Sequence, residues 1–438
     1  MRPIKASGMK TILLLLFTSF VAPFISAQTP APAGPQTRPI ALVGGTAHLG
    51  NGQVIENAVV TFKDGKIQTV ADLTNIRINR GEYTVIDTTG KHLYPGFILA
   101  SSQAGLTEVG SVRAMNDNAE RGEYNPNVRA LSSYNTDSEY LPTLRFNGIL
   151  TAQSTPTGGI ISGTSSIVQL DAWNWEDAAY VADDGVHLNW PSRTVRRFNF
   201  STFRRENRPN DAYDATLLDL ERMFSDARQY GRLNHKQNNL KLASLQGLFS
   251  GKQRLFLHAT DAKSMIEGVL FAQKHGVEKS VIIGGTDAMY IKDFLKKHQI
   301  PIVLTGTHRL PDQPSEDVNM PYLLPSLLQE AGIPFGITVG GLMGSRNLPF
   351  HAGTAAAYGL DKEQALAAVT GNVAKILGIS DRVGTLEAGK DATLFISQGD
   401  ALDMRGNIVE KAFIMGRDVP LSGMQQRLYD KYHEKYKN

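Results

Sequence analysis

Both ends of the chain contain short apolar runs of the kind that form β-strands. From about residue 39 to residue 94, runs rich in Val, Ile and Thr alternate with tight turns such as GNG at 50–52 and KDG at 63–65. Runs closed by Asn-Gly or Asp-Gly in this way are typical of antiparallel hairpins. The same pattern returns at 383–396 and 409–419. Because an isolated pair of strands is only marginally stable, we expect the C-terminal strands to complete the N-terminal sheet.

The middle of the chain alternates between apolar strand-like runs and helical segments. The run RLFLHAT precedes the helical DAKSMIEGVLFAQKHG, and the stretch 361–378 predicts a helix that is capped at Asp361 and stopped at Gly378. Such alternation with short loops predicts parallel βαβ units. Roughly 290 residues of it fit an eightfold barrel, which usually takes about 250 residues. An open, doubly wound sheet is the alternative, but neither a G-x-G-x-x-G after a first strand nor a P-loop supports it.

The predicted fold class is therefore α/β, with a TIM (β/α)8 barrel inserted in a small composite β-sandwich that both chain ends build. This organisation divides the chain into six predicted segments. They are a signal peptide (1–27), a Pro-rich linker (28–38), the N-terminal part of the β-sandwich (39–96), the barrel (97–383), the C-terminal part of the β-sandwich (384–420) and a C-terminal helical tail (421–438).

The first segment has the pattern of an export signal. Lys10 precedes the apolar run TILLLLFTSFVAPFI, and small residues around Ala27 form a cleavage context. This run is shorter than the about 20 apolar residues of a membrane span, although an uncleaved anchor is the alternative. The chain has no cysteine for a lipid anchor or a disulfide. We therefore expect an exported, periplasmic protein with no membrane span after signal cleavage.

Charge and composition narrow the function only a little. With 45 basic and 42 acidic side chains and 42% hydrophobic residues, the chain has the balance of an ordinary globular protein, and nothing predicts nucleic-acid binding. One basic and aromatic segment stands out, PSRTVRRFNFSTFRRENR, which carries six arginines between residues 193 and 208. It is either a solvated insertion between barrel elements or a surface that docks a partner or an anionic surface.

Several blocks of the sequence resemble the amidohydrolase superfamily, in its imidazolonepropionase-like or prolidase-like branch. They are NGQVIENAVVTFKDGKIQTV, VIDTTGKHLYPGFI, GGIISGTSSIVQLDAWNWED, LFLHATDAKSM, RNLPFHAGTAAAYGLDKEQALAAVTGNVAKILGISDRVGTLEAGKDATLFI and VEKAFIMGR. The resemblance covers most of the chain after the leader, and it implies a TIM barrel that interrupts a small β-sandwich. It also implies hydrolysis of C–N bonds by one or two metal ions at the C-terminal mouth of the barrel, where the metal activates a bound water.

The resemblance also indicates where the metal ligands of the family fall, and most of these positions hold other residues. The family phrase P-G-F-I-D-x-H-x-H reads PGFILASSQ here, so that its acid and two histidines fall at Leu99, Ser101 and Gln103. The sixth-strand histidine falls at Gly284 or its neighbour, and the last-strand aspartate falls near Gly340. None of these residues is a good ligand for a divalent metal ion.

The fifth-strand histidine is retained as His258. In two-metal members a lysine carbamate often bridges the ions, but no lysine occurs between Lys91 and Lys236. The corresponding stretch DDGVHLNWPSR offers only Asp183, Asp184 and His187. Because a single ligand does not hold a catalytic ion, we predict no metal cofactor, or at most a single divalent ion such as zinc at His258. A buried histidine that packs without a metal is the alternative for His258.

Two other groups could contribute to a site. His308 follows a predicted seventh strand near the mouth, whereas His351 opens a helix, where a packing or capping role is expected. Ser101 and its neighbour Ser102 lie at the right strand end, but no G-x-S-x-G elbow surrounds them. The predicted pocket positions are therefore Ser101, Gln103, His258, Gly284, His308 and Gly340, with no catalytic residue assigned.

Two functions remain open from the sequence. The first is an exported amidohydrolase-like protein with a degenerate metal centre, which acts as a small-molecule-binding or scaffold subunit, in a homo-oligomer or with an active relative. The second is an active hydrolase of C–N bonds in non-peptide amides, cyclic amides or dipeptides. It would use a reduced metal site or a metal-free site around His258, Asp261 and His308.

Overall fold

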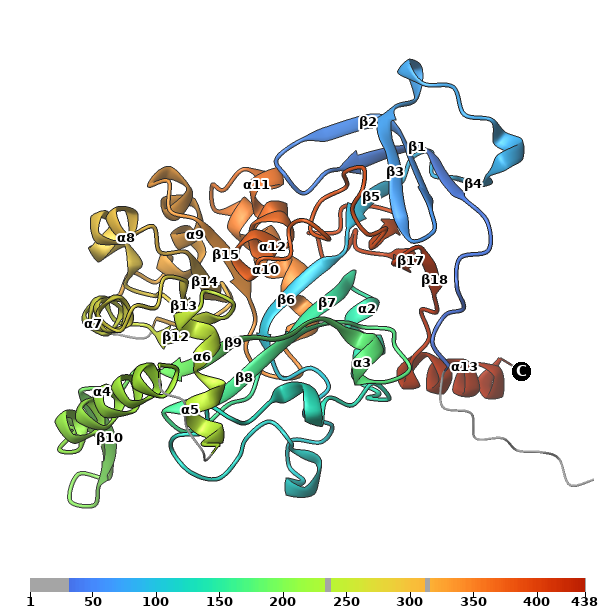
Figure 1. Ribbon diagram of the computed structural model, residues 1–438. Coiled ribbons are helices and arrows are strands. Elements are labelled where there is room, and N and C mark those ends of the chain that lie inside the picture. The colour runs from blue at the N-terminus through green and yellow to red at the C-terminus, as the bar shows by residue number, and fades with distance from the viewer. Residues whose placement is uncertain (1–30, 233–237, 312–315, 438) are drawn as a thin grey trace, which may run out of the picture. The chain divides into compact units, whose positions relative to one another are not determined.

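The computed structural model describes residues 31–232, 238–311 and 316–437 (Figure 1). The predicted signal peptide at 1–27 lies outside the described residues. From Pro32 onward the chain forms one compact unit.

Strands from both ends of the chain form one eight-stranded sheet with the order β18-β17-β16-β5-β1-β2-β3, and β4 pairs with β1. Its strands are β1 (Ile40–His48), β2 (Val54–Lys63), β3 (Lys66–Asp72), β4 (Thr84–Asp87), β5 (His92–Pro95), β16 (Leu394–Ser397), β17 (Val409–Ile414) and β18 (Arg417–Val419). The junction is antiparallel, with Leu394 of β16 opposite Pro95 of β5. The expectation that the C-terminal strands complete the N-terminal sheet is confirmed.

The second eight-stranded sheet forms the barrel, in the order β15-β14-β13-β12-β9-β8-β7-β6. Its strands are β6 (Phe97–Ser102), β7 (Ile149–Ser154), β8 (Ile161–Gln169), β9 (Ala179–Asn189), β12 (Arg254–Ala259), β13 (Ser280–Gly284), β14 (Ile302–Thr305) and β15 (Phe335–Thr338). The hydroxyl of Thr338 donates to the carbonyl of Ala100, so β15 closes against β6. The predicted fold class, α/β with a TIM barrel inserted in a small composite β-sandwich that both chain ends build, is confirmed.

One strand departs from the uniform parallel pattern. β8 runs antiparallel to both β7 and β9, while the other neighbouring strands of the barrel sheet run parallel. Parallel neighbours need a crossover of a dozen or more residues, and the connections at 155–160 and 170–178 are shorter than that. The chain therefore turns back on itself twice instead of crossing over through a helix.

Helices alternate with the barrel strands along the chain, and the last of them forms the C-terminal tail. They are α2 (Leu141–Arg145), α3 (Trp175–Ala178), α4 (Tyr213–Tyr230), α5 (Leu240–Ser244), α6 (Gln246–Phe249), α7 (Ala262–Lys274), α8 (Lys292–His298), α9 (Met320–Glu330), α10 (Leu348–Ala357), α11 (Lys362–Ala367), α12 (Gly371–Leu377) and α13 (Met424–Tyr436). No helix within the described residues combines the length and the apolar character that crossing a bilayer requires. The tail helix α13 has no buried residue.

The helix predicted at 361–378 is two helices. The Asp361 carboxylate does cap α11, since it accepts from the backbone N–H of Glu363 and Gln364, and Gly378 ends α12 with a φ of 76°. Between them the chain breaks at Thr370. A Cβ on the following Gly371 would lie 2.4 Å from the carbonyl oxygen of Gly50, so this close contact with the end sheet needs glycine.

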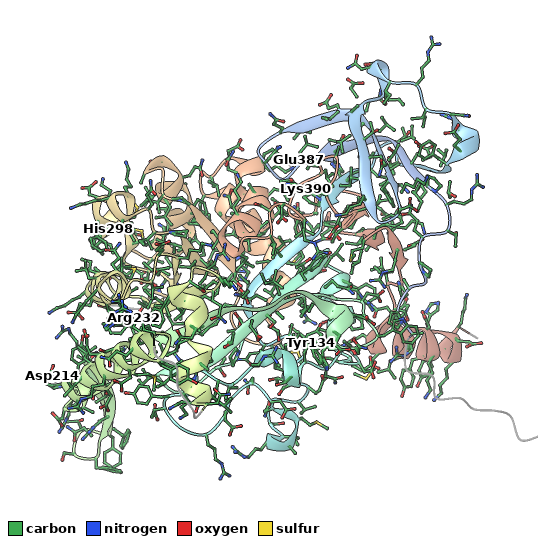
Figure 2. The ribbon with its side chains drawn as sticks, viewed as in Figure 1. Tyr134, Asp214, Arg232, His298, Glu387 and Lys390 are labelled. Atoms are coloured by element: carbon green, nitrogen blue, oxygen red, sulfur yellow. The ribbon has the colours of Figure 1, made fainter. Side chains whose placement is uncertain are left out.

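The start of α12 closes one end of the barrel. Its apolar residues join Ile98, Phe256, Val281 and Val303 of the barrel strands in one buried cluster. The turn that follows carries the ion pair of Glu387 and Lys390 at 2.8 Å and leads into β16 (Figure 2). Because this end is filled, a site must be sought at the opposite end, where the parallel strands have their carboxyl ends.

Candidate functional site

The carboxyl ends of the barrel strands bring two histidines into contact. β9 and β12 are parallel neighbours, with His187 opposite Phe256 and Asn189 opposite His258. The Nδ1 atom of His187 lies 2.8 Å from Nε2 of His258, so that one ring donates and the other accepts. The fully buried ring of His187 also stacks on Phe256 at 4.6 Å. His258 is thus not an isolated ligand position.

Sequence reasoning named His187 but did not pair it with His258. The signal was the strand register: once β9 and β12 are parallel neighbours, His258 lies two residues further along the paired strands than His187. The Nε2 atom of His187 has no hydrogen-bond partner among the described residues, although the side chain is fully buried. A buried imidazole with one unpaired nitrogen is a group that could receive a ligand atom.

Burial makes both imidazoles poor bases. It lowers the pKa of His258 to about 4 and, together with the charge of His258, holds the pKa of His187 well below its usual range. Both rings are therefore neutral near pH 7. Since the Nε2 atom of His258 is engaged by His187, a metal ion at that atom would have to displace its partner first.

Beneath the histidines, a polar network joins four barrel strands, β6, β7, β8 and β9. The side-chain amide of Gln153 donates to Asp184 at 2.7 Å, and its oxygen accepts from the backbone N–H of Ser101 at 2.9 Å. The hydroxyl of Ser165 donates to the other oxygen of Asp184 at 2.7 Å. Burial raises the pKa of Asp184 to about 6, while these hydrogen bonds and the charge of Arg254 oppose the rise. The network holds Ser101 in place from below.

An Asp184→Asn variant is expected to change how stability depends on pH. The pKa of Asp184 is about 6 in the folded protein against an ordinary value of 3.8, so its protonated form favours folding below about pH 4. This contribution, about 3 kcal/mol, is lost as the pH rises from about 4 to 6. The unfolding free energy of the variant minus that of the wild type, both measured in urea, should therefore increase as the pH rises through this range. Asp177→Asn, at an exposed carboxylate, is the matched control, and a flat difference between Asp184→Asn and wild type would contradict the assignment.

The first-strand positions do not present metal ligands. Leu99 is fully buried in the apolar core, and Gln103 is half-buried after the strand. Ser101 is half-buried and has a φ of 46°, a value that a non-glycine residue rarely adopts. Backbone strain of this kind is found more often at functional sites than elsewhere, and Ser101 lies at the carboxyl end of β6.

The two glycine positions differ in what they can accommodate. At Gly284, where φ is 116°, an added Cβ would lie 2.7 Å from the carbonyl oxygen of Ala259. A histidine cannot be restored there without moving the backbone. Gly340, in contrast, is exposed and has nothing within 4 Å of an added Cβ.

His308 belongs to a different set of contacts. Its Nε2 atom lies 2.6 Å from the hydroxyl of Thr354 on α10, and its ring packs on His351 at 4.0 Å. His351 in turn accepts from the backbone N–H of Thr307 at 2.9 Å through Nδ1. His351 therefore fastens the loop after β14 to α10, as the expected packing role requires. His308 lines a pocket of about 630 Å³ that α10 and residues 400–404 share.

The alternative site of His258, Asp261 and His308 is not joined by hydrogen bonds. The carboxylate of Asp261 caps α7 by accepting from the backbone N–H of Ser264 at 2.9 Å. His258 is engaged by His187, and His308 is engaged by α10. Each of the three residues thus has a separate structural partner.

The metal ion that the resemblance implies does not fit the side chains at this mouth. Across residues 31–232, 238–311 and 316–437, no group of three or more His, Cys, Asp or Glu side chains is placed to hold a metal ion. A catalytic zinc needs about three protein ligands, and the mouth offers the pair of His258 and His187. The side chains of Leu99, Ser101 and Gln103 cannot complete this set.

Comparisons with known proteins agree on the architecture. Residues 243–419 match the sequence profile described as the Amidohydrolase family. An amidohydrolase from Thermotoga maritima MSB8 has 23% identity and a TM-score of 0.74, over 86% of this chain and 99% of that one. A prolidase complexed with N-methylphosphonate-L-proline has 16% identity and a TM-score of 0.54, over 87% and 99%. A Xaa-Pro dipeptidase with bound methionine has 13% identity and a TM-score of 0.53, over the same shares.

No curated protein sequence matches the chain. The family profile covers the second half of the barrel and the returning strands of the end sheet, which are the blocks that carry the resemblance most specifically. The solved structures extend the likeness in fold to the first half. Residues 243–419 therefore resemble the Amidohydrolase family, and the chain shares the barrel and end sheet of solved amidohydrolases and prolidases.

Proposed function

We propose that this protein is an exported amidohydrolase-like protein that does not hydrolyse the substrates of its family and acts instead as a small-molecule-binding or scaffold subunit. The observation that carries the proposal is the pairing of His258. Its Nε2 atom is hydrogen-bonded to the buried imidazole of His187. The other ligand positions of the family hold Leu99, Ser101 and Gln103. The leader at 1–27 supports export to the periplasm.

The physical reason lies in how a hydrolytic water is made. A metal ion can lower the pKa of a bound water to near 7, but only where several protein ligands hold the ion and leave one position open. Without the ion, a base must remove the proton, and an imidazole whose pKa is about 4 removes protons weakly at neutral pH. His258 therefore supports neither a metal-activated water nor proton removal by a general base.

Binding makes smaller demands than hydrolysis. A pocket at the mouth needs a suitable shape and a few polar groups, and the strained Ser101 and the half-buried Gln103 are such groups. Since the fold is shared with prolidases, Xaa-Pro dipeptides are the natural first probes. A scaffold role, in a homo-oligomer or beside an active relative, would use the same fold without a ligand.

An active C–N hydrolase is the second candidate, and the unpaired Nε2 atom of His187 favours it. Two adjacent neutral imidazoles can take up one divalent ion if their mutual hydrogen bond opens. Such a centre would have two nitrogen ligands, and the substrate or water would have to supply the rest. The candidate therefore predicts activity that depends on both His187 and His258.

Metal analysis combined with an activity screen decides between the two candidates. The purified protein, exposed to zinc and then dialysed, is expected to retain far less than one zinc ion per chain. It should turn over Xaa-Pro dipeptides, N-acyl amino acids and cyclic amides no faster than the His187→Ala and His258→Ala variants do. His433→Ala, at an exposed histidine of α13, is the matched control.

The outcomes separate clearly. One or two tightly held zinc ions per chain, or turnover that only the His187 and His258 variants lose, would overturn the proposal in favour of the hydrolase.

Protein recovered from the periplasm should begin at Gln28, and a retained leader would contradict the proposed signal cleavage. A rise in melting temperature with Xaa-Pro dipeptide, without turnover, would support ligand binding.

A further inference from the structure

The arginine-rich segment forms a hairpin that pairs with no other strand among the described residues. β10 (Thr194–Asn199) and β11 (Arg204–Pro209) are antiparallel and make a two-stranded sheet of their own. In Figure 1 this hairpin extends away from the barrel next to α4, whose first turn carries the labelled Asp214 in Figure 2. Because an isolated two-stranded hairpin is marginal in water, something must hold it at its base.

The base is fastened to two helices. The guanidinium of Arg193 pairs with Glu267 of α7 and lies over the ring of Tyr213 of α4, at 4.4 Å from the ring centre. The hydroxyl of Tyr213 donates to the same carboxylate at 2.5 Å. The hairpin is therefore an arm with an anchored base, and its far end is left to contact something else.

Three phenylalanines gather at that far end. Phe198, Phe200 and Phe203 are 45%, 79% and 79% exposed. The ring of Phe198 packs edge-on against Phe200 at 5.1 Å and against Phe203 at 6.3 Å. We call residues 198–204 the hairpin tip. A contiguous apolar patch on an exposed tip costs solubility, and such patches mark interaction sites.

The hairpin tip is braced in this arrangement. The carboxylate of Glu206 accepts from the Asn199 side chain and from the Thr202 hydroxyl, each at 2.9 Å. The Asn199 side-chain oxygen accepts from the backbone N–H of Ser201 at 2.9 Å. Phe203 has a φ of 50°, which is rare for a bulky side chain. These hydrogen bonds hold the tip in one strained conformation in which the phenylalanine rings stay exposed. Little conformational entropy is therefore lost when the tip binds a partner.

The charge around the hairpin tip selects an anionic partner. Residues 193–208 contain six arginines, and their one acid, Glu206, is used to brace the turn. Arg197, Arg204 and Arg208 are exposed, and no carboxylate of the described residues pairs with Arg197 or Arg204. The phenylalanines form the outer end of the arm, and the arginines lie on the strands beside and behind them.

We propose that the hairpin tip binds the surface of an anionic phospholipid bilayer. Phenyl rings at the end of the arm enter the boundary between headgroups and acyl chains, while the arginines behind them contact lipid phosphates. A stable protein interface takes about 20–30 residues on each partner, whereas the hairpin tip has seven, 198–204. A bilayer sets no such minimum, because apolar burial and the attraction of each basic residue add to one another.

Fluorescence at the hairpin tip tests the proposal directly. The chain contains no cysteine, so Phe200→Cys provides a single attachment point for an environment-sensitive dye. Vesicles of phosphatidylcholine with phosphatidylglycerol are expected to shift the dye emission to the blue, and vesicles of phosphatidylcholine alone are not. Tyr290→Cys, at a side chain that is 80% exposed elsewhere on the protein, is the matched control and should show no shift on either vesicle. Raising NaCl from 0.1 to 1 M shortens the screening length from about 10 to 3 Å and should weaken binding.

Variants of the full chain separate the two parts of the surface. Replacing Arg197, Arg204 and Arg208 by Gln is expected to lower partition into the anionic vesicles on the order of 100-fold. Replacing the three phenylalanines of the hairpin tip by Ser should abolish the apolar contribution and lower partition by at least about tenfold. The control variant replaces three aromatics of the exposed helix α13, Tyr429, Tyr432 and Tyr436, by Ser and should bind like the wild type. All these proteins are compared as the chain that begins at Gln28, so the apolar leader does not contribute to vesicle binding.

Three results would overturn the proposal. The first is an unchanged emission of the Phe200→Cys dye in the presence of anionic vesicles. The second is equal partition of the hairpin variants and the wild type. The third is an emission shift with an acidic polypeptide such as poly-glutamate but not with vesicles, which would assign the arm to an acidic protein. Circular dichroism of each variant verifies that a loss of binding is not a loss of folding.

Discussion

Replacing His351 by asparagine is expected to remove a large part of the acid lability of this protein. Burial, together with the charge of the neighbouring His308, lowers the pKa of His351 to about 3, against an ordinary value of 6.5. Since the unfolded chain takes up a proton there first, stability present above about pH 6.5 is lost as the pH falls toward 3, by up to about 5 kcal/mol. An asparagine oxygen can accept from the N–H of Thr307 as Nδ1 does, without titrating.

Urea unfolding at pH 7, 6, 5 and 4 measures this effect. The wild type should lose stability at each step, and His351→Asn should lose less. His433→Asn, at an exposed histidine, should follow the wild type. Parallel curves for His351→Asn and the wild type would show that His351 does not resist protonation. His258, whose pKa is about 4, adds a slope of the same sign, and Asp184 adds one of the opposite sign.

The architecture could be predicted because local sequence patterns determine most of its strands and helices. Glycine turns and β-branched runs mark the strands of the end sheet, and strand–helix alternation marks the second half of the barrel. The cap at Asp361 and the stop at Gly378 were also local, and both hold. The domain boundaries drawn from these patterns stay predictions.

What the sequence could not provide was contact between distant residues. The reversal of β8 depends on which strand it pairs with, and the contact of His187 with His258 depends on the register of β9 against β12. The break at Thr370 follows from the approach of Gly50, more than 300 residues earlier. The resemblance could mark Gly284 as a changed ligand position, but the clash with Ala259 that excludes a side chain is a property of the fold.

The largest loss of stability from a single substitution is expected at Asp171, which joins three parts of the chain. Its Oδ1 atom accepts from Arg145 of α2 at 2.8 Å. Its Oδ2 atom accepts from Arg417 of β18 at 2.8 Å and from the backbone N–H of Ala33 at 3.0 Å. The side chains of Asp171 and Arg145 are only 4% and 7% exposed. One carboxylate therefore links the barrel, the end sheet and the segment before β1 that contains Ala33.

An Asp171→Ala variant should unfold with about 3–5 kcal/mol less free energy than the wild type, because it leaves the Arg145 guanidinium buried without its counter-charge. Asp418→Ala, on the same strand as Arg417, is the matched control. Its ion pair with Lys411 is as short, at 2.7 Å, but both side chains are largely exposed, so its loss should cost less than about 1 kcal/mol.

A double variant distinguishes the burial of charge from the loss of a contact. Arg145→Met combined with Asp171→Leu leaves neither of these two charges alone in the interior, and Arg417 keeps its bonds to the Asp171 carbonyl and to Gln169. The double variant should therefore be more stable than Asp171→Ala. If it is less stable, the carboxylate stabilises the fold mainly by holding Arg417 and the backbone of Ala33. The contacts between the chain ends and the barrel, rather than the neutralised charge of Arg145, would then account for the loss of unfolding free energy.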